Sequence, residues 1–126
     1  MQSDLPPNIG DFITRHIVSV EELEILLLLQ EGKERDWSPA EINERLRSQE
    51  ISISKWLDAL VALQLARQTA GGRYRFAPAS EELARATVAL ADAYRERRIK
   101  VIELIFSKPT ENLLEFVRAF ELRKRP

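Results

Sequence analysis

Three arginines and two adjacent glycines have the types and spacing that could bind phosphate. Arg67, Arg73 and Arg75 flank Gly71-Gly72 in a stretch that contains no acidic residue. Guanidinium groups bind phosphate through paired hydrogen bonds, and glycines allow a backbone to approach a phosphate closely. The stretch therefore predicts phosphate contact near the tip of a turn, although arginines that serve only solubility would look the same in sequence.

A second group of candidate residues lies upstream, at the start of a predicted helix. Ser52, Ser54 and Lys55 could contact bases or phosphates, because the N-terminal residues of a recognition helix enter the major groove. The helix also carries Asp58 and is therefore neutral. The alternative is that the two serines only cap a helix on a solvated surface.

No pattern in the chain is typical of catalysis. Cysteine is absent and His16 is the only histidine, which argues against a transition-metal site. We find no paired carboxylates in a catalytic frame, no phosphate-binding glycine loop and no nucleophilic serine motif. We therefore expect no enzymatic activity, no metal and no cofactor.

The charges are distributed unevenly between the two halves of the sequence. Residues 1–66 contain six basic and twelve acidic side chains, whereas residues 67–126 contain thirteen and eight. A positive field is expected on the second half, and the acidic first half could bind a protein partner. The N-terminus lacks the features of a signal peptide, and the longest apolar run, Ile25 to Leu29, is too short for a membrane span. We expect a cytoplasmic protein without a membrane partner.

Apolar spacing and capping residues predict a series of helices followed by a hairpin. Gly32 is expected to end one helix in a left-handed conformation. The predicted elements are a short helix over Ile9–Ile17, a helix over Val20–Gln30 capped by Ser19, a helix from Ser38 to about Arg47, a third helix from Ser52 or Ser54 that buries Leu57 and Leu60, strands over Leu65–Thr69 and Arg73–Phe76, a helix from Ser80 to about Phe106, and a last helix capped by Thr110.

This order predicts a mainly α-helical protein with a small β-hairpin, in the arrangement of a winged helix-turn-helix. Residues 1–18 would form an N-terminal extension with a short helix, residues 19–79 the winged module, and residues 80–126 a C-terminal helical arm. At 1.5 Å per residue, the helix from Ser80 would span roughly 40 Å, longer than the module it leaves.

The stretch from Ser38 to Phe76 resembles regulators of the MarR and ArsR type, in particular Ser54–Leu60 followed by Leu63–Leu65. One departure is Gln64, where such proteins have glycine. Nearly the whole chain is similar to a family of short stand-alone bacterial winged-helix proteins, which are labelled as regulators by fold analogy. The matching segments are His16-Ile17, Leu23–Leu29, Trp37-Ser38, Tyr94–Arg98, Val101–Phe106 and Phe116–Lys124.

The arm carries an apolar stripe that must be buried. Its members recur at approximate heptad spacing, with a break at Arg97 or Arg98, and the apolar side of the last helix adds two more: Leu83, Leu90, Tyr94, Val101, Ile105, Leu113 and Phe120. The stripe could pack on a second copy of the arm, on the last helix folded back, or on the N-terminal helix. We favour a homodimer.

Two functions remain open from the sequence. The first is a DNA-binding transcriptional regulator in which Arg67, Arg73 and Arg75 hold the duplex backbone. The alternative is a winged-helix module that binds a protein and does not bind DNA by itself. The arginines favour the first, and the acidic balance of residues 1–66 favours the second.

Overall fold

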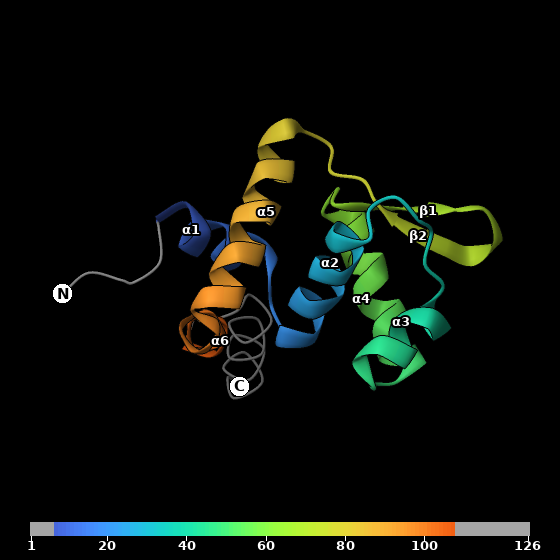
Figure 1. The fold of residues 1–126 in the computed structure, drawn as a ribbon, viewed down its shortest axis with the longest axis horizontal. Coiled ribbons are helices and arrows are strands. Elements are labelled where there is room, and N and C mark those ends of the chain that lie inside the picture. The colour runs from blue at the N-terminus through green and yellow to red at the C-terminus, as the bar shows by residue number, and fades with distance from the viewer. Residues whose placement is uncertain (1–6, 108–126) are drawn as a thin grey trace, which may run out of the picture.

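The structure is a computed structural model of the 126-residue chain and describes residues 7–107. Over these residues the chain is mainly helical, with one two-stranded antiparallel hairpin (Figure 1). Helix α2 (Val20–Glu31) lies in the middle. Helices α1, α5 and α6 lie on one side of it and form the α1–α5–α6 half, whereas α3, α4 and the hairpin lie on the other and form the α3–α4–hairpin half.

The central helix is apolar on most of its surface because it contacts both halves. It packs against α3, α4, α5 and β2. Its fully buried apolar residues are Leu23, Ile25, Leu26 and Leu29. Ser19 caps it as predicted, accepting from the N–H of Glu22 at 2.9 Å, while the Glu22 carboxylate accepts from the N–H of Val18 at 2.8 Å.

Gly32 follows the central helix, but its role differs from the predicted left-handed stop. Its φ is −100°, which any residue can adopt. The glycine is needed for space instead, since a Cβ at this position would lie 2.6 Å from Cζ2 of Trp37. The Trp37 ring lies against the glycine backbone, and its Nε1 donates to the Gly32 carbonyl at 3.2 Å.

Helix α3 (Pro39–Leu46) begins with the predicted capping box, in which Ser38 and Glu41 satisfy each other's backbone N–H groups. Helix α4 (Glu50–Ala62) begins earlier than predicted. Its N-cap is Gln49, so Ser52 and Ser54 lie inside the helix rather than at its cap. The prediction assigned the capping role to the serines because hydroxyls favour caps, whereas Gln49 caps only through its extended backbone.

Helix α4 ends in a Schellman motif at the position where the resembling regulators have glycine. The N–H of Leu65 donates to the Leu60 carbonyl at 3.0 Å, and that of Gln64 donates to the Val61 carbonyl at 3.0 Å. Gln64 takes φ = 65°, a left-handed conformation that is unfavourable for a residue with a Cβ. The backbone turn is therefore retained although the glycine is replaced.

The hairpin consists of β1 (Ala66–Thr69), a short 3-10 turn at Ala70–Gly72 and β2 (Arg73–Phe76). Gly71 and Gly72 have φ of 76° and 71°, which explains the two glycines at the tip. On its other edge β2 forms an isolated bridge with Trp37, and two backbone hydrogen bonds of 2.7 Å join Trp37 to Tyr74.

The predicted continuous helix from Ser80 to Phe106 is wrong. The chain forms α5 (Glu81–Glu96), capped by Ser80, and α6 (Arg98–Ser107), with a break at Arg97, where φ is −137°. Between Tyr94 and Val101 most side chains are charged, so this turn has no continuous apolar face to hold it straight against a neighbour.

The segment after Ser80 folds back onto the chain and is not an arm that leaves the module. Helix α5 contacts α1, α2 and α6, and α6 also contacts α1. Leu90, Val101 and Ile105, predicted to contact a second copy, are buried in the chain's own core. Of the three covers considered for the apolar stripe, the structure therefore shows the N-terminal helix for these three residues. Leu113 and Phe120 lie outside the described residues.

Two further stripe residues lie at the edge of that core. Leu83 and Tyr94 are half-buried and pack against it. The Tyr94 hydroxyl donates to Glu24 Oε2 at 2.9 Å and so links α5 to α2. Burial and the neighbouring Glu24 carboxylate raise the pKa of Tyr94 to about 12.

Candidate functional site

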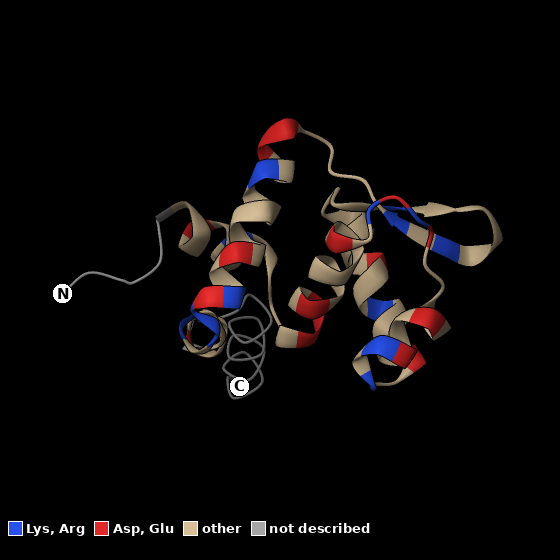
Figure 2. Cartoon of the chain, viewed as in Figure 1, with Lys and Arg blue, Asp and Glu red and all other residues tan. Residues whose placement is uncertain are grey.

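The arginines of the hairpin share one face because of the strand register. Arg67 pairs with Arg75 and Thr69 with Arg73, whereas Tyr74 alternates to the opposite, buried face. The structure therefore brings the three predicted phosphate-binding arginines together on the outer face of the hairpin. The charge distribution of this region is drawn in Figure 2.

Two of these arginines are paired with acids, contrary to the prediction that they are unopposed. Arg75 Nε lies 2.6 Å from Asp36 Oδ1, and its NH2 group donates to the Glu34 carbonyl at 3.2 Å. Arg73 NH1 lies 2.9 Å from Glu41 Oε1 and 3.4 Å from the Asp36 carbonyl. The acids come from the α2–α3 loop and the start of α3, more than thirty residues away in sequence, which is why local sequence could not show them.

The pairing keeps these carboxylates ionised. The hydrogen bond from Arg75 lowers the pKa of Asp36, and the nearby charge of Arg67 contributes to the same shift. The backbone hydrogen bond from Ser38 lowers the pKa of Glu41, and the charges of Arg73 and Arg35 add to it. At neutral pH the two carboxylates Asp36 and Glu41 therefore offset part of the positive charge of the arginines on this face.

The start of α4 is organised by a single carboxylate on α2, Glu21. It accepts hydrogen bonds from the hydroxyls of Ser48 and Ser52, the latter at 2.6 Å, and from Trp56 Nε1 at 3.1 Å. Partial burial alone would raise the pKa of Glu21, but these three donors and the charge of Lys55 lower it. The Ser52 hydroxyl, predicted to contact a groove, is thus engaged within the chain.

The other residues of α4 that face solvent are mixed in character. Ile51 is 85% exposed in the first turn, and sequence analysis missed it because it assigned this residue to a turn. The Lys55 ammonium lies 4.7 Å from the ring centre of Trp56. Asp58 accepts a 3.1 Å hydrogen bond from the Tyr74 hydroxyl, and Ser54 is half-buried. We refer to Ile51, Lys55 and Asp58 of α4 and Arg67, Arg73 and Arg75 of the hairpin together as the α4–hairpin surface, in which Arg73 and Arg75 are only half-exposed.

No known protein family, curated protein or solved structure matches this chain significantly. The function is therefore inferred from the residues of the chain itself.

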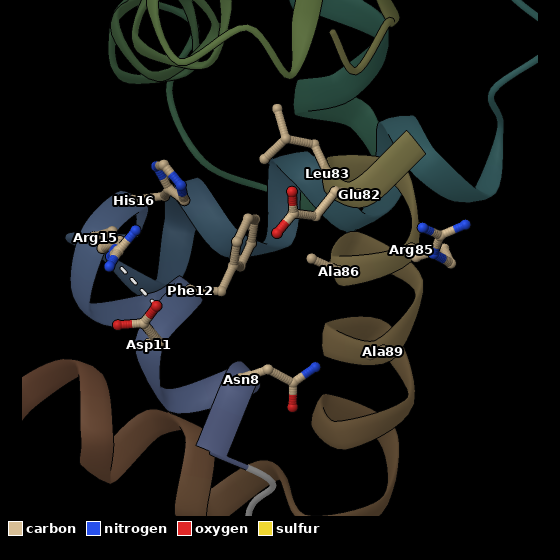
Figure 3. Close-up of a pocket in the computed structure, with 10 residues that line it drawn as sticks. All are labelled: Asn8, Asp11, Phe12, Arg15, His16, Glu82, Leu83, Arg85, Ala86 and Ala89. Atoms are coloured by element: carbon tan, nitrogen blue, oxygen red, sulfur yellow. Dashed lines mark ion pairs between the residues drawn. The ribbon is translucent and has the colours of Figure 1, made fainter. Parts of the chain in front are cut away.

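A hollow with a volume of about 590 Å³ lies between α1 and α5 (Figure 3). Phe12 and Leu83 line it with large apolar side chains. On the α5 side the small side chains of Ala86 and Ala89 leave space for the hollow. The polar residues around it are Asn8, Asp11, Arg15, His16, Glu82 and Arg85. Its charges are balanced and include the Asp11–Arg15 ion pair of 3.3 Å, so its electrostatics favour neither an anion nor a cation.

Over residues 7–107 neither a metal-binding cluster nor a membrane-spanning helix is present. This part of the chain brings together no group of three or more His, Cys, Asp and Glu side chains that could hold a metal ion. Among the described helices, none has the length and apolar character needed to cross a membrane.

Proposed function

We propose that the chain is a winged-helix module that binds another protein through the α4–hairpin surface and does not hold duplex DNA by itself. The order of α2, the Trp37 bridge, α3, α4, β1 and β2 supports the winged-helix assignment. The order alone does not decide the ligand, because winged folds carry several kinds of binding site.

The observation that carries the proposal is the pairing of Arg73 and Arg75 with Glu41 and Asp36. Affinity for DNA comes largely from Lys and Arg side chains that neutralise phosphates. A guanidinium can exchange its carboxylate for a phosphate, but the carboxylate then remains beside the phosphate and repels it. The paired acids therefore remove much of the electrostatic attraction that the hairpin would otherwise provide.

The rest of the surface has the composition of a protein interface. Ile51 supplies an exposed apolar side chain on α4, and the hairpin supplies arginines with their acidic partners. Protein interfaces combine an apolar centre with a polar rim and are enriched in arginine. The partner would offer a small apolar pocket for Ile51, with charges of both signs around it.

A DNA-binding regulator remains the second candidate. Arg67 is exposed and acts on Asp36 through its charge, and a Cβ added to Gly71 or Gly72 would meet nothing within 4 Å. These features leave the tip of the hairpin open to a phosphate. They supply fewer cationic contacts than the sequence predicts, because two of the three arginines are paired.

Binding to mixed genomic DNA fragments over a range of salt separates the two candidates. We expect no retention of the unchanged protein at low salt. The variant Asp36→Asn/Glu41→Gln should gain retention, because it removes two negative charges and frees two arginines. Glutamine still completes a capping box, so the start of α3 is preserved. Two new phosphate contacts would give a slope of log affinity against log salt of about −1.8.

The control adds Arg73→Ala/Arg75→Ala to that variant and should abolish the gain. If the unchanged protein is retained with a steep salt dependence, and Arg73→Ala/Arg75→Ala alone abolishes it, the interaction module is refuted and the regulator is supported.

The protein partner is tested directly by a photoreactive residue at position 51. A matched control carries the same residue at Val88 on α5, which is 45% exposed and lies in the other half of the molecule. We expect one discrete covalent adduct from position 51 in cells and none of that size from position 88. Identical adducts from both positions would contradict a specific partner on the α4–hairpin surface.

A further inference from the structure

Helix α6 has a broad apolar face and a polar side formed by Lys100 and Glu103, and the chain's described core covers only part of the apolar face. Val101 and Ile105 are buried against α1 and α5. On the rest of the apolar face Ile99 is 66% exposed and Phe106 is 77% exposed. Ile102 lies between them and does not belong to the core cluster. We call Ile99, Ile102 and Phe106 the outer stripe of α6.

The three residues follow one another at intervals of three and four, so they lie on one face of the helix. Ile99 and Phe106 are exposed two turns apart, with the half-buried Ile102 between them, so the three side chains form a continuous apolar stripe rather than scattered surface residues.

We infer that the outer stripe is the docking surface for the chain's own C-terminal segment, residues 110–122. Nineteen residues follow Ser107, and α6 leads directly into them. In sequence, Leu113, Val117 and Phe120 repeat at intervals of four and three, the reverse of the order in the stripe. Two antiparallel helices with equal rise would place Phe106 opposite Leu113, Ile102 opposite Val117 and Ile99 opposite Phe120.

The connection at Lys108-Pro109-Thr110 suits a tight reversal, because proline disfavours helix at the preceding residue and helical hairpins need only two to five connecting residues.

The occupant is the same chain rather than a second copy because of effective concentration. A short linker holds its segment near the stripe at a concentration in the millimolar range. A second copy would have to reach that concentration in solution to compete. Docking of this segment also buries the apolar residues of both partners without any other protein.

Engineered cysteines provide the test, because the natural chain contains none. The full-length double variant Ile102→Cys/Val117→Cys places two thiols opposite each other in the inferred register. The matched control, Ile102→Cys/Glu115→Cys, carries the same change on α6 and moves the second thiol to the far side of the C-terminal segment. We expect mild oxidation to give a disulfide within one chain in the first variant and little or none in the control.

The disulfide is detected by faster migration without reductant, at the size of one chain. Covalent dimers as the main product would overturn the inference and assign the stripe to a second copy. Absence of any disulfide, or equal yields in both variants, would also overturn it.

A second measurement does not depend on disulfide geometry. Phe120→Asp in the full-length protein should uncover the stripe and increase the fluorescence of a hydrophobic dye severalfold, whereas Glu121→Asp should leave it unchanged. Equal dye fluorescence in both variants would contradict the inference.

Discussion

The two halves of the molecule share one apolar core, with Leu57 and Leu60 buried in one half and Ile13 and Leu90 in the other, but they differ in how their surface charges are arranged. In the α3–α4–hairpin half, many surface side chains are fixed by charged groups: Glu21 anchors the start of α4, and Asp36 and Glu41 hold the hairpin arginines. In the α1–α5–α6 half, apolar residues such as Ile13 and Leu90 are removed from water entirely. Apolar burial contributes most to stability, whereas surface ion pairs contribute little but decide the charge that a partner meets.

The comparison implies that stability and binding can be changed separately. Substitutions in the α1–α5–α6 core should lower stability without changing the α4–hairpin surface. Substitutions in the ion pairs of the hairpin should change binding without lowering stability. The experiments below test each part, beginning with the largest effect.

Leu90→Ala is expected to have the largest effect on stability. Leu90 has no exposed surface, so its replacement removes apolar burial and leaves a cavity. A loss of about 2–5 kcal/mol in the free energy of unfolding is expected from such substitutions. Urea unfolding measures it, with Val88→Ala, on a 45% exposed neighbour, as the control that should change little. Equal losses in both variants would contradict the core assigned to α5.

Glu21→Gln is expected to have an intermediate effect that depends on pH. The folded state lowers the pKa of Glu21 below 4.5, so its stabilising contribution is present above pH 4.5 and is lost as the pH falls through the folded-state pKa. The glutamine variant should lose about 1.5 kcal/mol at neutral pH, since hydrogen bonds to a charged group are stronger than those to a neutral one.

Unfolding followed at pH 7 and at pH 3 measures this difference. The gap between the variant and the unchanged protein should narrow at the lower pH, because protonation of Glu21 removes the charge that its hydrogen-bond donors stabilise. A gap of the same size at both values would show that the charge of Glu21 does not hold the start of α4.

Arg75→Ala is expected to have the smallest effect on stability. Its ion pair with Asp36 is solvent-accessible, and such pairs contribute little because water and salt screen them. The midpoint of urea unfolding should remain within experimental scatter of the unchanged protein, and Arg67→Ala should behave alike. A clear drop in the unfolding midpoint for Arg75→Ala alone would show that the Arg75–Asp36 ion pair contributes to stability and would contradict the difference drawn between the two halves.

Local signals in the sequence predicted the elements well where each signal acts over a few residues. Ser38 and Glu41 form the expected capping box, and the glycines at the hairpin tip have the expected positive φ. These predictions succeed because cap and turn chemistry is decided by neighbouring residues.

The errors come from contacts between distant parts of the chain. Arg73 and Arg75 have no acid nearby in sequence, and their partners approach only when the Trp37 bridge forms. The stripe over Leu90 and Val101 looked like a subunit interface because the sequence does not show that α1 folds over it. The break at Arg97 was missed because charged residues continue a helix well by propensity alone.

The positions of the two tryptophans give one half of the molecule an optical signal of its own. Trp37 is buried beside the hairpin and Trp56 lies on α4, so both of the chain's tryptophans belong to the α3–α4–hairpin half. Intrinsic fluorescence therefore follows that half, whereas circular dichroism follows the helices of both. Coinciding curves would show one cooperative unit, and separated curves would show that the two halves melt independently.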